Sequence, residues 1–226
     1  MSQAQVAARP VGEVRINTFL AQVYLLMALG LAVTGFVASW ASQNFVLVLQ
    51  TMRPGVAFGL FIVEIILVVF LSAAATKMSP TLAFLAFLFY AAVTGLTFAS
   101  LFAVYAETRI AQVFWVTAGV FLVTSVVGMV LKKDLSSAGY VLFMLLLGWT
   151  IAWLFSWFFP GFNLLLTYIG IALFIGLTAY DTQRIKEIGK QIEDHPARGG
   201  LIVIGALVLY LDFINLFLLL LRASNR

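Results

Sequence analysis

Long apolar stretches separated by short polar segments make up almost the whole of this 226-residue chain. Seven of them reach the length of about twenty residues that an α-helix needs to cross the hydrocarbon core of a bilayer. The pattern therefore predicts an all-α membrane protein with a single domain. The predicted spans are Phe19 to Trp40, Gly55 to Thr76, Leu82 to Tyr105, Ile110 to Leu131, Ala138 to Phe159, Phe162 to Asp181 with a polar extension, and Leu201 to Leu221.

The polar residues at the two ends set the limits of this domain. Residues 1–16 are predicted to form a polar cytoplasmic tail, residues 17–222 the seven-helix transmembrane domain, and residues 223–226 a short carboxyl-terminal tail. The first apolar run is too long for the core of a signal peptide, and no small-residue cleavage site follows it. We therefore expect no cleavage.

Composition supports the same class. Hydrophobic residues make up 63% of the chain and charged residues 10%, whereas ordinary globular domains are about 45–50% apolar and about 25% charged. The chain has no cysteine, which excludes disulfides, thiolate metal sites and cysteine nucleophiles.

The net charge is +4, and the positions of the basic residues along the chain indicate how the chain is oriented in the membrane. If the amino terminus is cytoplasmic, nine basic residues lie inside and four outside, as the positive-inside rule expects for seven spans with the carboxyl end outside. This bias explains the basic composition without nucleic acid as a partner. The inner residues are Arg9, Arg15, Lys77, Lys132, Lys133, Arg184, Lys186, Lys190 and Arg198, and the outer ones Arg53, Arg109, Arg222 and Arg226.

Two acidic residues lie inside the last two spans. If the sixth helix continues to about Glu193 and the seventh begins near Gly200, Asp181 and Asp212 each lie twelve residues from the turn between them. With a rise of ~1.5 Å per residue, both stand ~18 Å from that turn. The two carboxyls are therefore predicted to face each other inside the membrane.

Such a pair combines proton and cation chemistry. Two close carboxyls in a low-dielectric interior cannot both ionise cheaply, so one proton is retained and the pair titrates as a unit. The doubly ionised form offers the hard oxygen ligands that Ca²⁺ prefers, with Asn215, backbone carbonyls and water to complete the shell. We expect Asp181 and Asp212 to be the proton sensor and gate and transient Ca²⁺ ligands, with Thr178, Arg184 and Asn215 as supporting residues.

Glu64 lies nine positions after Gly55, near the middle of the second span. An ionised acid at the bilayer centre costs ~2.5–3.5 kcal/mol on insertion scales, so this side chain is expected to face the bundle interior. Two interpretations stay open. Glu64 is either a structural carboxyl bonded to neighbouring hydroxyls or amides, or it lines the ion path from the outer half.

Small residues also predict where helices approach closely. The patterns are Gly55-Val-Ala-Phe-Gly59 in the second span and Gly95-Leu-Thr-Phe-Ala-Ser100 in the third. Small side chains spaced in this way allow the backbone of a neighbouring helix to come near. The segment Ala41 to Pro54 is predicted to be the longest outer loop.

Non-channel interpretations of the acidic pair remain. In a structural one, Arg184 neutralises Asp181, while Asn215 and nearby hydroxyls hold Asp212. A transporter with alternating access is a further alternative, but the duplicated halves with paired broken helices that it requires are not visible in the sequence.

An enzyme interpretation is disfavoured. Intramembrane aspartyl proteases also carry one aspartate on each of two helices, the first after a tyrosine, as at Tyr180-Asp181. Their second motif needs glycines one and three residues before the aspartate, where this chain has Leu211 and Leu209. The single histidine, His195, lies in a polar loop, which argues against a metallo- or serine hydrolase. We expect no catalytic residues and no cofactor.

Three motifs resemble those of the Bax inhibitor-1 family, particularly its bacterial members. They are Gly95-Leu-Thr-Phe-Ala-Ser100, Leu177-Thr-Ala-Tyr-Asp181-Thr-Gln-Arg-Ile-Lys186 and Ala206-Leu-Val-Leu-Tyr-Leu-Asp212-Phe-Ile-Asn-Leu-Phe. The resemblance covers roughly Asn17 to Arg222. It implies a central seventh helix wrapped by the other six, and a pH-sensitive Ca²⁺ leak gated by an aspartate pair that maps onto Asp181 and Asp212.

The chain differs from the family pattern in two places. Some members latch the first aspartate with an arginine of the second helix, whereas this helix has no basic residue before Lys77, which leaves Lys77 or Arg184 as the substitute. The lysine-rich tail of animal members is replaced by Arg222-Ala-Ser-Asn-Arg226, so a cell-death function tied to that tail is not expected.

Two functional hypotheses follow, both for a protein integral to the bacterial inner membrane. The first is the Ca²⁺ leak, with the lipid bilayer, Ca²⁺ and protons as partners. The second comes from bacterial relatives that are associated with a membrane protease. In it the chain is an interaction protein that modulates a membrane-bound protease or a stress response without conducting ions.

Overall fold

The computed structural model describes residues 11–131, 135–156, 160–192 and 195–225. Within these ranges the chain forms helices and no strand, and seven helices are long and apolar enough to cross a membrane, which confirms the predicted class. In chain order the elements are α1 (Val11–Ser42), α2 (Phe45–Thr51), α3 (Pro54–Ala74), α4 (Pro80–Phe98), α5 (Leu101–Val104), α6 (Glu107–Val130), α7 (Ser136–Phe155), the short 3-10 helix η1 (Pro160–Phe162), α8 (Asn163–Gln191) and α9 (Arg198–Ala223).

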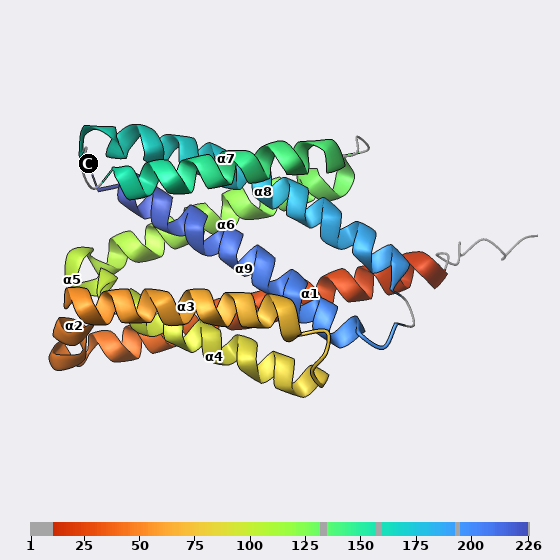
Figure 1. Ribbon diagram of the computed structural model, residues 1–226, viewed down its shortest axis with the longest axis horizontal. Helices are drawn as coiled ribbons and strands as arrows, with labels where there is room; N and C mark the ends of the chain where they lie inside the picture. The colour runs from red at the N-terminus through yellow and green to blue at the C-terminus, as the bar shows by residue number, and fades with distance from the viewer. Residues whose placement is uncertain (1–10, 132–134, 157–159, 193–194, 226) are drawn as a thin grey trace, which may run out of the picture.

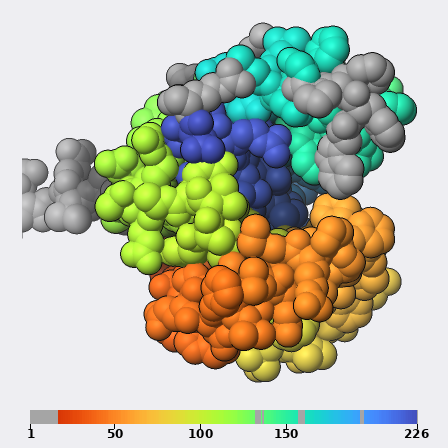
Figure 2. Space-filling model, turned by 90° about the vertical axis from the view of Figure 1, so that its left-hand side faces the viewer, coloured from red at the N-terminus to blue at the C-terminus, as the bar shows by residue number. Residues whose placement is uncertain are grey.

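The last helix, α9, lies at the centre of the bundle (Figure 1). Of its most apolar stretch 61% is buried, against 44% or less for every other span in the described residues. It packs against α1 and α4 on one side and α6 and α8 on the other, with a smaller contact to α3. Figure 2 shows α9, in blue, between the orange helices and the teal ones.

The helix α7 is as peripheral as α3, since 6% of the apolar stretch of each is buried. It packs on α8, and its Leu146 and Trp149 reach α9 through an apolar cluster that contains Leu216 and Leu219.

The seventh span, α9, is central and surrounded by the other spans, as the family resemblance implied.

A buried tyrosine fixes the rotation of α9. The Thr34 hydroxyl of α1 donates to a backbone carbonyl of α4 at 2.9 Å, so the Tyr210 hydroxyl donates to Thr34 Oγ1, at 2.6 Å. Phe87 and Tyr90 of α4 hold the Tyr210 ring edge-to-face, each with a centroid distance of 5.7 Å. Residues two apart on a helix point about 200° apart. Asp212 therefore points to the side of α9 opposite to Tyr210.

The predicted close helix contact at Gly95 is confirmed, and the one at Gly55 and Gly59 is wrong. A methyl group on Gly95 would lie 2.8 Å from the Thr34 carbonyl oxygen of α1 and 2.7 Å from Val37 Cβ. A methyl group on Gly55 or Gly59 would meet nothing within 4 Å. Because only 6% of the apolar stretch of α3 is buried, its glycines have no neighbouring helix to accommodate.

The segment between the first two spans is not a plain loop. Residues Phe45–Thr51 form α2, and the Asn44 side chain caps this helix by accepting from the backbone N–H groups of Val46 and Leu47 at 3.1 and 3.2 Å. The third span is also interrupted. It breaks at Ala99 and Ser100, between α4 and α5.

The beginning of α1 and the end of α9 lie at opposite ends of the bundle (Figure 1). The ends of α3, α6 and α8 lie at the same end as the start of α1, which we call the amino-terminal end. Helix α1 begins at Val11, inside the predicted polar tail. Four residues of the charge prediction lie outside the described residues: Arg9, Lys132, Lys133 and Arg226. Which end faces the cytoplasm stays a prediction.

Candidate functional site

Asp181 of α8 and Asp212 of α9, the carboxyl pair, are close enough to interact electrostatically. Asp212 is 5% exposed and Asp181 is half-buried. Asp181 lies ten residues before the end of α8 and Asp212 fourteen residues after the start of α9, rather than twelve and twelve. The counts differ because α8 ends at Gln191 and α9 begins at Arg198, each two residues earlier than assumed; Glu193 lies outside the described residues.

One oxygen of the pair has no donor. Asp212 Oδ2 is buried and accepts no hydrogen bond from any described residue. An ionised carboxylate in this position would be costly, because no donor among the described residues compensates its charge at this oxygen. The surroundings therefore suit a carboxyl that holds a proton or meets a cation.

Two predicted supporting residues satisfy their own helices instead. The Asn215 amide Nδ2 donates to the Leu211 carbonyl at 2.8 Å, and the fully buried Thr178 hydroxyl donates to the Phe174 carbonyl at 2.8 Å. The Asn215 amide therefore donates this hydrogen bond within α9 and not to Asp212. The structure therefore gives no support to the structural interpretation in which the Asn215 amide holds the Asp212 carboxyl by this hydrogen bond.

Arg184 and Asp181 share a small cavity between α8, α9 and the beginning of α1. The exposed Arg184 guanidinium acts electrostatically on Asp181. The cavity has a volume of about 100 Å³, and we call it the Asp181 cavity. It is lined by Phe19, Asp181, Arg184, Ile185, Ile188, Leu201, Ile204, Gly205 and Val208.

A chain of hydroxyls beside Asp181 was not predicted. Thr182 is fully buried and hydrogen-bonds through Oγ1 to Ser125 Oγ of α6 at 3.4 Å and to the Tyr24 hydroxyl of α1 at 3.2 Å. These bonds join three helices next to Asp181 and fix the rotation of α8. In the sequence, the only indication of this chain of hydroxyls was that Thr182 directly follows Asp181. Nothing in the sequence indicated that Tyr24 and Ser125 would be the partners of Thr182.

Glu64 lies in a different place. Its Oε1 accepts a hydrogen bond from Thr97 Oγ1 of α4 at 2.6 Å, and its charge acts on Tyr210. Because Tyr210 and Asp212 point to opposite sides of α9, α9 stands between Glu64 and the carboxyl pair. The contact with Thr97 fits the structural interpretation of Glu64, and its role in an ion path stays a prediction.

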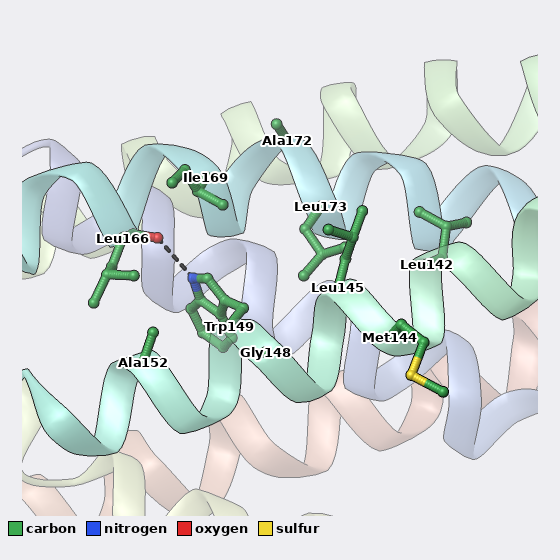
Figure 3. A pocket seen from close by; sticks show the side chains of 10 residues that line it. All are labelled: Leu142, Met144, Leu145, Gly148, Trp149, Ala152, Leu166, Ile169, Ala172 and Leu173. Atoms are coloured by element: carbon green, nitrogen blue, oxygen red, sulfur yellow. Dashed lines mark hydrogen bonds between the residues drawn. The ribbon is translucent and has the colours of Figure 1, made fainter.

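A second, apolar groove lies between α7 and α8, with a volume of about 550 Å³ (Figure 3). Its one polar side-chain group, Trp149 Nε1, donates to the Leu166 carbonyl at 2.8 Å. Met144, Leu145 and Ile169 remain exposed on it. Without a charged residue in its lining, this groove is no candidate for an ion site.

Among the described residues, no further His, Cys, Asp or Glu joins the carboxyl pair. The described residues contain no group of three or more His, Cys, Asp or Glu that could hold a metal ion.

In the part of the chain that the structure describes, six spanning helices around a buried seventh, α9, which contributes one carboxyl of an internal pair, define an integral membrane protein of the helical-bundle class. The chain belongs to the Bax inhibitor-1 family, since the family profile described as "Inhibitor of apoptosis-promoting Bax1" matches residues 16–225.

Bacterial relatives match over nearly their whole length. The inner membrane protein YbhL of Escherichia coli (strain K12) is 44% identical over 213 residues, which cover 92% of this chain and 91% of the relative. A protein of Borreliella burgdorferi is 39% identical over 210 residues, with 91% and 90% covered. A membrane protein of Streptococcus pyogenes serotype M3 is 35% identical over 220 residues, with 95% of both chains covered.

Proposed function

We propose that this chain is a pH-sensitive passive Ca²⁺ leak channel of the bacterial inner membrane, gated by Asp181 and Asp212. The observation that carries the proposal is the interacting carboxyl pair at the contact of α8 with the central helix, with Asp212 Oδ2 buried and without a donor. Membership of the Bax inhibitor-1 family and similarity to an inner membrane protein support it.

The gate follows from the charge of the pair. While the two carboxyls share a proton, they attract each other and hold α8 against α9. When the last proton leaves, the two carboxylates carry like charges and repel each other, and this repulsion is stronger in the protein interior than in water because the dielectric constant is lower there. This repulsion favours separation of the two helices, and it is relieved by a divalent cation between the carboxylates. The leak is therefore expected to increase as the pH rises.

The remaining parts of the proposal concern the ion and its direction. Ca²⁺ is proposed as the permeant ion and not as a resident cofactor. The amino-terminal end of the bundle is assigned to the cytoplasm and the carboxyl end to the outside, from the distribution of basic residues. Glu64 is assigned to the outer half of the path.

The test is Ca²⁺ flux into reconstituted vesicles that contain a fluorescent Ca²⁺ indicator, measured over a series of pH values. The wild type should show a flux that rises with pH, and Asp181→Asn and Asp212→Asn should remove the pH dependence. Glu107→Gln is the matched control, because Glu107 is an exposed carboxyl at the start of α6. A wild-type pH profile in both aspartate variants would exclude the gate.

The same experiment separates the alternative function. If the wild type conducts no Ca²⁺ at any pH, and the double aspartate variant still binds a membrane-bound protease, the chain is an interaction protein that works without ion flow.

A further inference from the structure

We infer that the Asp181 cavity is a water-accessible half-channel through which protons reach Asp181 from the amino-terminal end of the bundle, with Phe19 controlling its width. This inference rests on the proposed function for its purpose, because it names the route by which the gate senses pH. The existence of the route is a separate matter and can be tested without measuring Ca²⁺.

The position of the lining residues gives the direction. Ile188 lies three residues before the end of α8, and Leu201 three residues after the start of α9, so both are near the amino-terminal end. Asp181 and Val208 each lie ten residues from those same helix ends. At ~1.5 Å per residue the cavity lining therefore extends ~10 Å along the two helices and reaches ~15 Å from their ends at Asp181 and Val208.

The cavity has the size and the polar groups that water requires. A volume of about 100 Å³ has room for about three water molecules at ~30 Å³ each. A purely apolar cavity would stay dry, but the Asp181 carboxyl and the Arg184 guanidinium both line this one and provide an acceptor and several donors.

The groups around Asp181 make it the first proton acceptor. Arg184 acts on it from α8 and Asp212 from α9, while α1 and α6 present Tyr24 and Ser125 through the neighbouring Thr182. Asp212 does not line the cavity. A hydronium ion in the cavity transfers its proton to an Asp181 carboxylate oxygen and leaves as water, and the proton is then shared with Asp212.

Phe19 is placed to narrow the cavity. Its ring is 2% exposed and lines the cavity from α1. A methyl group on Gly189 of α8 would lie 2.7 Å from Phe19 Cδ1, so the glycine provides the space that the ring occupies. A smaller side chain at position 19 leaves the cavity wider at this point.

The absence of cysteine allows a direct test with single cysteines in the full chain. Ile204→Cys and Val208→Cys report on the cavity, and a membrane-impermeant thiol reagent is applied to spheroplasts and to inverted membrane vesicles. Gln191→Cys at the amino-terminal end and Gln43→Cys at the opposite end identify the accessible side in each preparation. Val116→Cys reports on the lipid-facing side of α6, where the side chain is 56% exposed.

The expected result is that both cavity cysteines react in the same preparation as Gln191→Cys, with Val208→Cys slower than Ile204→Cys, while Val116→Cys does not react. Adding Phe19→Leu should accelerate labelling of Val208→Cys. Each variant is first checked for a single monodisperse peak in size-exclusion chromatography.

Two results would overturn the inference. One is that Ile204→Cys and Val208→Cys remain unlabelled where Gln191→Cys reacts, which means that the cavity is dry. The other is labelling from the side of Gln43→Cys. Labelling as expected in a protein that conducts no Ca²⁺ would leave the half-channel in place and remove the proposed leak, so the two failures are distinguishable.

Discussion

Replacing Gly128 of α6 with alanine tests whether tight packing of α6 on α8 holds the carboxyl pair in place. A methyl group at Gly128 would collide with the Ala179 carbonyl oxygen and lie 3.0 Å from Ala179 Cα, whereas ordinary contacts begin at 3.4 Å. Helix α8 must therefore move away by at least ~0.4 Å at this Cα and further at the carbonyl. Since the obstacle is backbone, no side chain can rotate to relieve it.

The cost can be isolated with a matched control. Overpacking of this kind costs about 1–3 kcal/mol, while any glycine to alanine change inside a helix gains up to about 1 kcal/mol. Gly119 lies in the same helix, and a methyl group there would meet nothing within 4 Å. Because the gain in helix propensity is common to both, Gly128→Ala should be less stable than Gly119→Ala by about 1–3 kcal/mol.

The difference is measurable as a melting temperature. For a chain of this size, 1 kcal/mol corresponds to about 2–4 °C, so thermal unfolding of the two detergent-solubilised variants resolves the expected effect. Ala179 precedes Asp181 by two residues, so the displacement should also alter the pH profile of the leak. Equal melting temperatures for the two variants would refute the tight contact between α6 and α8.

Three further substitutions have defined outcomes. Tyr210→Phe removes the hydroxyl that donates to Thr34 and should cost about 0.5–1.5 kcal/mol in thermal unfolding, whereas Tyr168→Phe on an exposed residue should cost nothing measurable. Arg184→Gln removes a positive charge that acts on the carboxyl pair, so the leak should rise only at more alkaline pH; an unchanged profile would contradict this. Glu64→Gln keeps an acceptor for its threonine partner but removes the charge, so Ca²⁺ flux should fall at every pH, and an unchanged flux would identify a structural carboxyl.

Apolar run length predicted the number and order of the spans, because a helix is the structure in which a lone apolar segment satisfies all its backbone groups in lipid. The same runs gave little information on rotation, since a helix that is apolar on all sides carries no marked face. For this reason the glycines of α3 were wrongly assigned to a helix contact, while Gly95 was assigned correctly.

Short features were missed for a different reason. The run Phe45–Thr51 is too short to span a membrane, and its helical character depends on the cap from Asn44, which the span pattern does not register. The break between α4 and α5 follows no proline or charged residue, so hydropathy shows one continuous span there.

The carboxyl pair was predictable because two acids at similar depth in neighbouring spans are rare and expensive in a membrane. The surroundings of the pair were not predictable. The bonds of Thr182 join α8 to residues 57 and 158 positions away in the sequence, and the Asp181 cavity includes Phe19 from the first helix. Such contacts depend on how the helices rotate and cross, which spacing within one helix does not specify.

The most buried of the spans in the described residues follows the other six in the chain. Before α9 has been inserted, the preceding spans already reside in the bilayer with their future α9-facing surfaces unfilled, and Tyr210 and Asp212 have not yet met their neighbours. The finished interior therefore arises only after α9 has joined the six spans that precede it. A nascent chain stopped before Arg198 would leave that interior open to lipid.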